Sequence, residues 1–329
     1  KFTNSEILKS GAVSYTWTGS GTVDGVGTHV TALSGGNLTA GSKTVDVTGL
    51  VDGSEYTLQL TSTDLADNVA NVVTVNGIMY DETAPGFGSM TPLAGSRINA
   101  VTRKVYWTNS EQLGSGEIKY VGTSGADSGN TRSVDLGTKL ASGAQNIDVS
   151  GLVNASTYTL SMNGTDVAGN VATTVSNANI LYDTVVPGFG AVTPASSGRI
   201  GPNTRTVAWS NTETLASGQV EYEGTAGGDS GVKHTIDMGT AGKLGAGNQS
   251  VDAGALVNNS TYKLTVSGTD LAANAGTPVV KTGIVYDDVL PGFGSVTPIT
   301  DKKVNAAGRR VYWTNSEALL SGTVKYTGT

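Results

Sequence analysis

The segment VYWTNSEQLGSG, residues 105–116, decides the fold because its phrase returns along the chain at a nearly constant step. Related segments are VAWSNTETLASG at 207–218 and VYWTNSEALLSG at 311–322, and KFTNSEILKSG at 1–11 is a shortened copy. The aromatic residue of the phrase is in turn Phe2, Trp107, Trp209 and Trp313. Self-similarity at a fixed step, here about 103 residues, is the signature of a tandem array of one structural unit.

Two further phrases keep the same step. The first is LVDGSEYTLQLTSTDLADN at 50–68, with copies at 152–170 and 256–274, and the second is YDETAPGFGSMTP at 80–92, with copies at 182–194 and 286–298. A proline is a poor member of a central strand, so we place the unit boundaries at the proline of the second phrase. The predicted domains are 1–84, a partial repeat lacking its first strands; 85–186 and 187–290, complete repeats; and 291–329, the first strands of a further repeat.

Within each unit apolar and polar residues alternate, which is the period of a β-strand with one buried face. We predict strands over residues 56–60, 13–15 and 45–47, each with counterparts in the later units. Clusters of Gly, Asn and Ser separate the strands at the spacing typical of a sandwich or barrel. The predicted fold class is all-β, with tandem β-sandwich domains of about seven strands in each repeat.

The composition excludes several kinds of function. A formal net charge of −7 argues against nucleic acid, because phosphate binding needs a basic face. The chain has no cysteine, which excludes disulfides and thiolate zinc sites. No apolar run approaches the ~18 residues of a membrane span, and residues 1–30 are not a signal peptide, so we expect no membrane insertion in this segment.

These phrases resemble fibronectin type III and bacterial Ig-like repeats. VYWTNS is similar to the second strand of such domains, and LVDGSEY, LVNASTY and LVNNSTY are similar to the tyrosine corner, in which a Tyr hydroxyl bonds back to the backbone. TDLADN, TDVAGN and TDLAAN resemble the final hairpin turn of Ig-like repeats in large bacterial surface adhesins and extracellular fibre proteins. The type III proline between Leu and Tyr is replaced by Asp52, Asn154 and Asn258, so the bacterial Ig-like pattern is the nearer one.

The resemblance assigns structural roles to two sets of aromatic residues. The expected core anchors are Trp107, Trp209 and Trp313, and the expected corner tyrosines are Tyr56, Tyr158 and Tyr262. It also implies a secreted, extracellular module at a bacterial cell surface, acting as an adhesin stalk or as the body of a filament. The rival functions are a module that binds a carbohydrate or another surface, including a surface glycan, and an accessory array of an extracellular enzyme.

Carboxylates and amides near the predicted junctions are candidate Ca²⁺ ligands, because Ca²⁺ prefers six to eight hard oxygens. The candidates at the junctions are Asp81, Glu82, Asp183, Asp287 and Asp288. The candidates in the turn phrase are Asp64, Asn68, Asp166, Asn170, Asp270 and Asn274. The competing interpretation is that these residues only form turns, where Asp and Asn bond their own backbone.

The recurring glutamates of the tryptophan phrase, Glu6, Glu111, Glu213 and Glu317, have two interpretations. They either contact a neighbouring unit or chain, or only follow a strand-end turn.

Catalysis is not expected, because no nucleophile motif occurs and the two histidines, His29 and His234, match Arg132 in the second unit. The expected partner is the chain itself, through neighbouring repeats or through the complementary partial domains of neighbouring chains.

Overall fold

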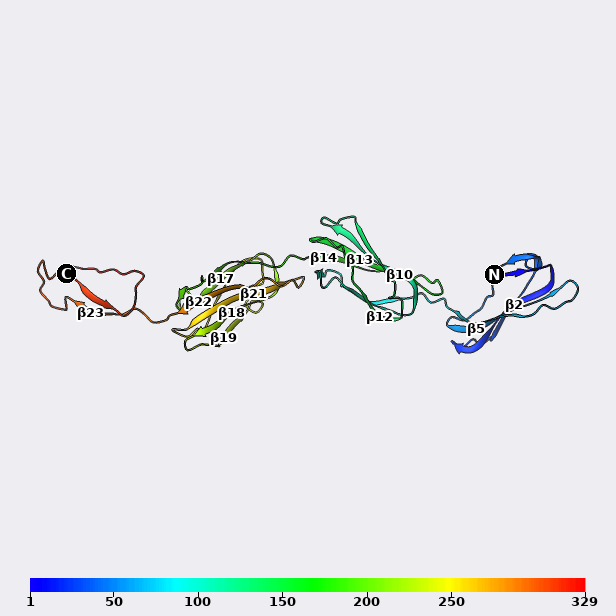
Figure 1. Ribbon diagram of the computed structural model, residues 1–329, viewed down its shortest axis with the longest axis horizontal. Helices are drawn as coiled ribbons and strands as arrows, with labels where there is room; N and C mark the ends of the chain where they lie inside the picture. The colour runs from blue at the N-terminus through cyan, green and yellow to red at the C-terminus, as the bar shows by residue number, and fades with distance from the viewer. Residues whose placement is uncertain (329) are drawn as a thin grey trace. The chain divides into compact units, whose positions relative to one another are not determined.

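The computed structural model describes residues 1–328, so Thr329, the last residue of the predicted segment 291–329, lies outside the described residues. The chain divides into two compact units, Lys1–Thr184 and Val185–Thr329. Within the described residues the regular structure is β-strand, apart from the short 3-10 turn η1 (Gly35–Leu38) (Figure 1). No helix in this part of the chain is long and apolar enough to cross a membrane.

Unit 1 contains one complete β-sandwich. Its strands are β7 (Phe87–Thr91), β8 (Arg97–Ile98), β9 (Val105–Asn109), β10 (Leu113–Ser124), β11 (Thr131–Asp135), β12 (Gly143–Ile147), β13 (Ser156–Asp166) and β14 (Val175–Tyr182). One sheet has the order β12-β9-β7, and the other has the order β11-β10-β13-β14-β8. The all-β sandwich prediction is confirmed, and the strand beyond the expected seven is the two-residue β8, which pairs in parallel with β14.

The core of this sandwich forms where the alternating residues of both sheets meet. Trp107 on β9 is 2% exposed, and Tyr158 on β13 is 0% exposed. Burial of a side chain of this size removes 150–250 Å² from water, which stabilises the fold by roughly 4–6 kcal/mol before the entropy cost. Tyr120 on β10 packs edge-on against Tyr158, with ring centroids 5.8 Å apart and an interplanar angle of 90°. The period-2 pattern of the sequence therefore selects which face of each strand joins the core.

Unit 2 contains a second complete sandwich with the same plan. Its strands are β15 (Phe189–Thr193), β16 (Arg199–Ile200), β17 (Thr206–Asn211), β18 (Leu215–Ala226), β19 (Lys233–Asp237), β20 (Gly247–Asp252), β21 (Thr261–Asp270) and β22 (Val279–Tyr286). The sheet orders are β15-β17-β20 and β16-β22-β21-β18-β19, matching the first sandwich strand for strand. Trp209 and Tyr262 take the places of Trp107 and Tyr158, and they are 2% and 0% exposed.

The first repeat, also in unit 1, has fewer strands. They are β1 (Phe2–Asn4), β2 (Leu8–Gly21), β3 (Thr28–Ala32), β4 (Gly41–Lys43), β5 (Ser54–Asp64) and β6 (Val73–Tyr80). The large sheet is β3-β2-β5-β6, and the small sheet is only β1-β4. The strand predicted at 45–47 is wrong, because β4 ends at Lys43 and residues 44–50 carry no regular structure.

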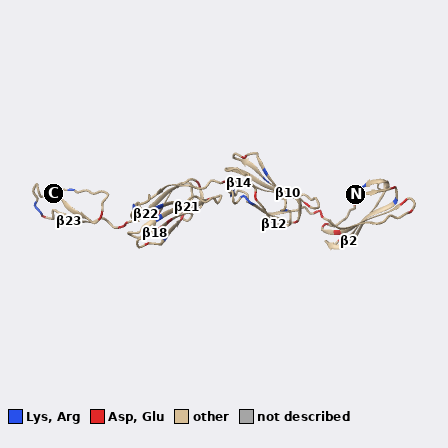
Figure 2. Ribbon diagram, viewed as in Figure 1, with Lys and Arg blue, Asp and Glu red and all other residues tan. Residues whose placement is uncertain are grey.

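Residues 291–328 form only the hairpin of β23 (Phe293–Thr297) and β24 (Tyr312–Asn315). The expectation that Trp313 anchors a core is wrong for this chain, because Trp313 is 44% exposed. The counterparts of the large sheet that covers Trp107 and Trp209 are not formed within the described residues. Figure 2 shows that acidic and basic residues are dispersed along both units instead of gathered in blocks of one sign.

Candidate functional site

The tryptophan phrase forms a connected set of hydrogen bonds at the start of each complete repeat. The Trp107 indole Nε1–H donates to Asn109 Oδ1 at 2.7 Å, and Asn109 Nδ2 donates to the carbonyls of Lys139 (3.1 Å) and Ala141 (2.8 Å). Trp209 and Asn211 repeat the first bond at 2.8 Å. The asparagine therefore satisfies the buried indole and holds the loop before β12 in place, because a buried polar group without a partner is costly.

The next residue of the phrase holds the linker that enters the repeat. Ser110 Oγ accepts a hydrogen bond from the Gly86 N–H at 2.8 Å, and the Ser110 N–H donates to the Gly86 carbonyl at 3.0 Å. Thr212 and Gly188 make the same hydroxyl contact at 2.8 Å in the next complete repeat. The recurrence of the phrase reflects this link between β9 and the Pro-Gly-Phe segment.

A side chain of the first repeat, Asp52, also bonds this linker. Asp52 Oδ1 accepts from the Glu82 N–H at 2.6 Å, and Asp52 Oδ2 accepts from the Thr83 hydroxyl at 2.6 Å. These two bonds lower the pKa of the Asp52 carboxyl, the bond from the Glu82 N–H contributing most. Asp52 stands where the type III pattern has a proline, which offers no side-chain acceptor. The replacement is visible in the sequence, but the contact that Asp52 makes with Glu82, 30 positions away, is not.

The later repeats place an asparagine at the same position with the same effect. Asn154 Oδ1 accepts from the Thr184 N–H at 2.7 Å, and Asn258 Oδ1 accepts from the Asp288 N–H at 3.2 Å. A side-chain oxygen thus bonds the backbone N–H of the residue that directly follows each Tyr-Asp pair. We name Asp52, Asn154 and Asn258 the linker clamps.

The turn phrase of the second repeat also forms a hydrogen bond with the first linker. Asn170 Nδ2 donates to the Asp81 carbonyl at 2.9 Å, and the same amide donates to Asp166 Oδ2 at 2.8 Å. Asp166 Oδ1 also accepts from the backbone N–H groups of Gly169 (2.6 Å) and Asn170 (2.8 Å). Burial alone would raise the pKa of Asp166, but these hydrogen bonds hold the pKa below its usual value. The linker is therefore bonded to both repeats that it joins.

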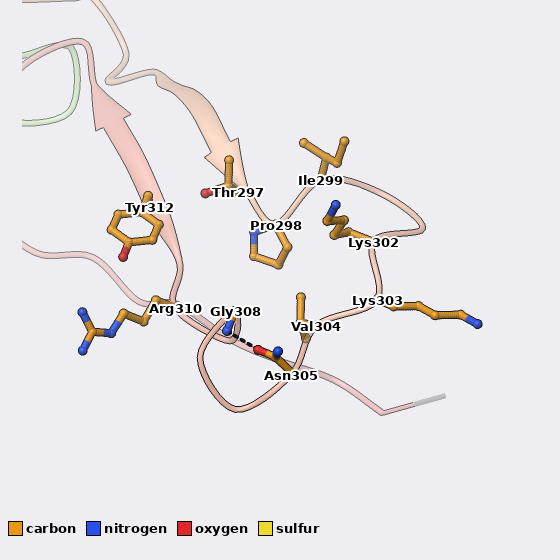
Figure 3. A pocket seen from close by; sticks show the side chains of 10 residues that line it. All are labelled: Thr297, Pro298, Ile299, Lys302, Lys303, Val304, Asn305, Gly308, Arg310 and Tyr312. Carbon is orange, nitrogen blue, oxygen red and sulfur yellow. Dashed lines mark hydrogen bonds between the residues drawn. The ribbon is translucent and has the colours of Figure 1, made fainter.

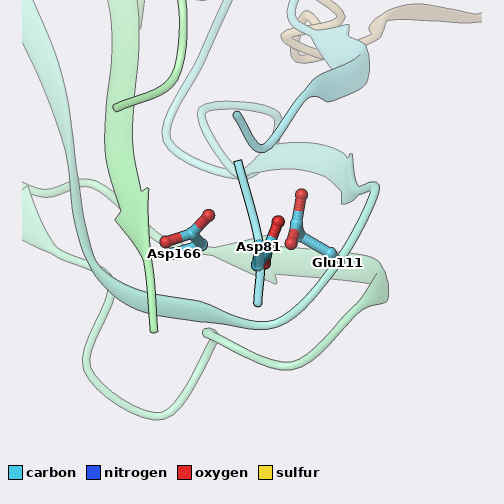
Figure 4. A group of neighbouring side chains, drawn as sticks. All are labelled: Asp81, Glu111 and Asp166. Carbon is cyan, nitrogen blue, oxygen red and sulfur yellow. The ribbon is translucent and has the colours of Figure 1, made fainter. Parts of the chain in front are cut away.

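Three carboxylates meet beside this contact and could hold a metal ion. Asp81, Glu111 and Asp166 each place an oxygen within 4.8 Å of the other two. Figure 4 shows the side chains of the three residues. Burial, and then the charges of Asp81, Asp166 and Asp52, raise the pKa of Glu111. Carboxylate oxygens are the hard ligands that Ca²⁺ prefers, and these three groups would supply part of the six to eight oxygens that it takes. Sequence analysis placed Asp81 and Asp166 among the ligands but gave Glu111 only a contact or turn role.

The other predicted ligands make different contacts. Asp64 accepts from the Ala66 N–H at 2.7 Å and from the Asn68 side chain at 2.8 Å, so this pair forms a self-contained turn. Glu82 is exposed and accepts the Tyr80 hydroxyl. Such local bonds are the ordinary use of Asp and Asn in turns.

Unit 2 and the end of unit 1 hold the remaining candidates. Asp270 Oδ2 accepts from Asn274 Nδ2 at 2.8 Å, repeating the turn of the second repeat. Asp287 lies 3.8 Å from the Arg199 guanidinium, and Asp288 is exposed. Asp183, the sequence counterpart of Asp81, is half-buried.

The corner tyrosines bond a carboxylate that the sequence analysis did not single out. The Tyr158 hydroxyl accepts from the Val153 N–H at 2.7 Å and donates to Asp127 Oδ2 at 2.8 Å. Asp24 and Asp229 are the equivalent partners of Tyr56 and Tyr262, each at 2.7 Å. The sequence does contain a signal for these carboxylates, because each Asp stands five residues before the His or Arg that occupies the matching position in its repeat.

A separate hollow lies beside β23 and β24 and is lined by three basic side chains. Figure 3 shows that Lys302, Lys303 and Arg310 point in different directions. The side chain of Asn305 accepts the Gly308 N–H at 2.8 Å and so caps its own turn. Because the three cations do not converge, this hollow lacks the arrangement that would bind an anion.

Comparison with protein-family models finds no match, and comparison with curated proteins finds none either. Among solved structures, the FN1–FN3 domains of chicken CNTN1 are similar at 11% identity and a TM-score of 0.33, over 86% of this chain and 91% of that one. The fibronectin(III)-like modules of Clostridium thermocellum CbhA are similar at 12% identity and a TM-score of 0.32, over 61% and 94%. Likenesses at these scores carry no weight for function, and the strand order of the two complete sandwiches is itself the evidence for the fold.

Proposed function

We propose that the chain is a structural repeat segment of a secreted bacterial cell-surface protein, serving as an adhesin stalk or as the body of an extracellular filament. The observation that carries the proposal is the linker of residues 81–86, which is bonded to the repeats on both of its sides. Asp52 of the first repeat and Asn170 of the second repeat bond the N–H and the C=O of one peptide group of this linker, the group between Asp81 and Glu82. The role is mechanical and non-catalytic.

Each contact contributes to the stiffness of the joint. A short linker with free backbone groups samples many conformations, whereas each fixed residue gives up about 1–2 kcal/mol of backbone entropy. The two bonds to Asp52 have a charged acceptor, whereas the bonds to Asn154 and Asn258 have a neutral one. Asp52 is exposed, so solvent weakens its bonds. Length in such an array then grows by one sandwich per repeat.

Calcium is the second part of the proposal. A Ca²⁺ ion held by Asp81, Glu111 and Asp166 would join the linker to the second repeat, and it would offset the repulsion that raises the pKa of Glu111. Isothermal titration calorimetry of the whole chain with CaCl₂ tests this assignment. We expect Glu111→Gln to remove the heat of binding of one ion, with exposed Asp46→Asn as the matched control. Unchanged binding in Glu111→Gln would contradict it.

Contact between chains is the third part. In residues 291–328 the side chains of Phe293 and Val296 are 59% and 49% exposed, whereas their counterparts Phe189 and Val192 are 7% exposed each. On β6 the first repeat exposes Val73 and other apolar side chains. We propose that a second copy covers these surfaces. Light scattering at rising concentration would show oligomers, and a monomer at every concentration would contradict this part.

Limited proteolysis tests the linker directly. A protease that cuts after glutamate has a site at the exposed Glu82, whose N–H is held by Asp52. We expect cleavage there to be slow, and to be about tenfold faster in Asp52→Ala, because the protease must bind the linker in an opened form. Asp46→Ala is the control. Equal cleavage in Asp52→Ala and in the unmodified chain would contradict the clamp.

A further inference from the structure

The carboxylate bonded to each corner tyrosine has a second side-chain partner, a histidine or an arginine, which differs from repeat to repeat. In the first repeat Asp24 Oδ2 accepts from His29 Nε2 at 2.6 Å, and in the third repeat Asp229 Oδ2 accepts from His234 Nε2 at 2.5 Å. In the second repeat Arg132 Nη2 donates to Asp127 Oδ1 at 2.6 Å. We call these three groups the corner carboxylates: Asp24, Asp127 and Asp229.

The corner carboxylates are buried and ionised. Asp24, Asp127 and Asp229 are 2%, 1% and 5% exposed. The hydrogen bond from Tyr56, followed by the bonds from His29 and two backbone N–H groups, lowers the pKa of Asp24 to about 2. The tyrosine bond is likewise the main cause that lowers the pKa of Asp127 and Asp229. Each repeat therefore encloses a negative charge at neutral pH, and a buried charge is costly unless it is paired.

The three repeats differ in how they compensate this charge. Arg132 is always protonated, and its Nε also donates to the Gly151 carbonyl at 2.8 Å. An imidazole donates a hydrogen bond to the carboxylate in its neutral form, but it supplies a positive charge only after taking up a proton, and a histidine normally does so between pH 5 and 8. Proton uptake therefore adds the attraction between opposite charges to a hydrogen bond that already has a charged acceptor.

We propose that proton uptake by His29 and His234 stabilises the first and third repeats, and that Arg132 makes the second repeat insensitive to the same change. The array would then respond to acidification repeat by repeat. The stability that these pairs add is present while the imidazoles carry the proton and is lost when they release it. A carboxylate that stays ionised across this range is what makes the protonated form the favoured partner.

The groups around each imidazole support this assignment. His29 faces Asp24, and it faces Tyr56 edge-on at 6.1 Å and Tyr15 across the strand pair. Burial raises the pKa of the Tyr56 hydroxyl, which stays neutral, so the carboxylate supplies the charge that acts on the ring.

The third repeat has the same surroundings. His234 faces Asp229, and it faces Tyr262 edge-on at 6.2 Å and Tyr222 across the strand pair. The nearby Lys233 is paired with Glu221 at 3.0 Å, so the two charges largely cancel.

Hydrogen exchange of the whole chain at pH 5.5 and pH 8 tests the proposal, after correction for the intrinsic exchange rate. The probes are the amides of β5, β13 and β21, which carry the corner tyrosines of the three repeats. We expect protection of β5 and β21 to fall about tenfold on going to pH 8, because their corner carboxylates then lose a positively charged partner, and we expect protection of β13 to stay constant. An equal change in all three strands, or none in β5 and β21, would overturn the proposal.

Exchanged partners provide the matched variants. Arg132→His should make β13 pH-dependent, and His234→Arg should remove the dependence of β21 while leaving β5 unchanged. Where a variant fails to fold, the unmodified chain still decides the question, because it contains only two histidines and their NMR signals can be followed separately. If both imidazoles keep one protonation state from pH 5.5 to pH 8, no proton uptake occurs and the proposal fails.

Discussion

Two buried tyrosines of the second repeat provide a sharp test of the account, because they differ in one respect only. Tyr158 and Tyr120 are both 0% exposed and pack against each other edge-on. The Tyr158 hydroxyl bonds Val153 and Asp127, whereas the Tyr120 hydroxyl has no hydrogen-bond partner within residues 1–328. Burial raises the pKa of both hydroxyls, so both stay neutral.

We expect Tyr158→Phe to lower the free energy of unfolding of this repeat by about 3 kcal/mol. The loss combines a hydrogen bond to a charged acceptor, about 1.5–3 kcal/mol, with an N–H group of Val153 left without its partner. Tyr120→Phe removes a buried hydroxyl that bonds nothing, so it should leave stability unchanged or raise it by up to about 1 kcal/mol. Both substitutions keep the ring and its packing.

Native-state hydrogen exchange measures these effects in the intact chain, where a single global transition is not expected for several domains. The amides of β10 and β13 report on the second repeat, and those of β21 serve as an internal control. For Tyr158→Phe we expect protection to fall by about a hundredfold, since 1.4 kcal/mol corresponds to a factor of ten. A similar loss in Tyr120→Phe, or less than about 1 kcal/mol in Tyr158→Phe, would refute the assignment of the corner bonds.

Three further outcomes follow from the second repeat. Asn109→Ala should lower the free energy of unfolding of the second repeat by about 2–3 kcal/mol, measured by hydrogen exchange of the β9 amides, because the Trp107 indole loses its buried acceptor. A loss under about 0.5 kcal/mol would count against this role. Near-ultraviolet circular dichroism should show acid unfolding, because the lowered pKa of Asp127 gives stability that is complete above the ordinary carboxyl pKa of 3.8 and is lost as pH falls below it. A spectrum that stays unchanged on acidification would contradict it. Gly122→Ala should destabilise by about 3 kcal/mol, since its Cβ would lie 2.0 Å from the Asp127 carbonyl oxygen, while Gly88→Ala, with 3.9 Å to its nearest contact, should be tolerated in the same exchange assay.

Local pattern was enough to predict the sandwiches. Alternation over residues such as 56–60 predicted β5 and its counterparts, and the repeated phrases predicted that each strand recurs in the next unit. The prediction at 45–47 was wrong because an alternating apolar pair also occurs in an extended loop. The short strands β8 and β16 carry two residues each, which is too few to show a period.

The site could be predicted only where its contacts are local in sequence. Asp166 and Asn170 are four residues apart, and their turn was one of the two interpretations offered. The contact of Asp52 with Glu82 spans 30 residues, and the contact of Asn170 with Asp81 spans 89, so no local pattern could reveal them. Such pairings depend on how the folded repeats bring their loops together.

The central claim is that side-chain bonds hold the first linker, and a distance distribution across that linker tests it most directly. The chain has no cysteine, so Val26→Cys in the first repeat and Val101→Cys in the second, both at exposed positions, allow specific labelling for single-molecule fluorescence transfer. We predict a narrow distribution that broadens when Asp52 and Asn170 are both replaced by alanine. A distribution that is broad from the start and does not change in the double variant would contradict the claim.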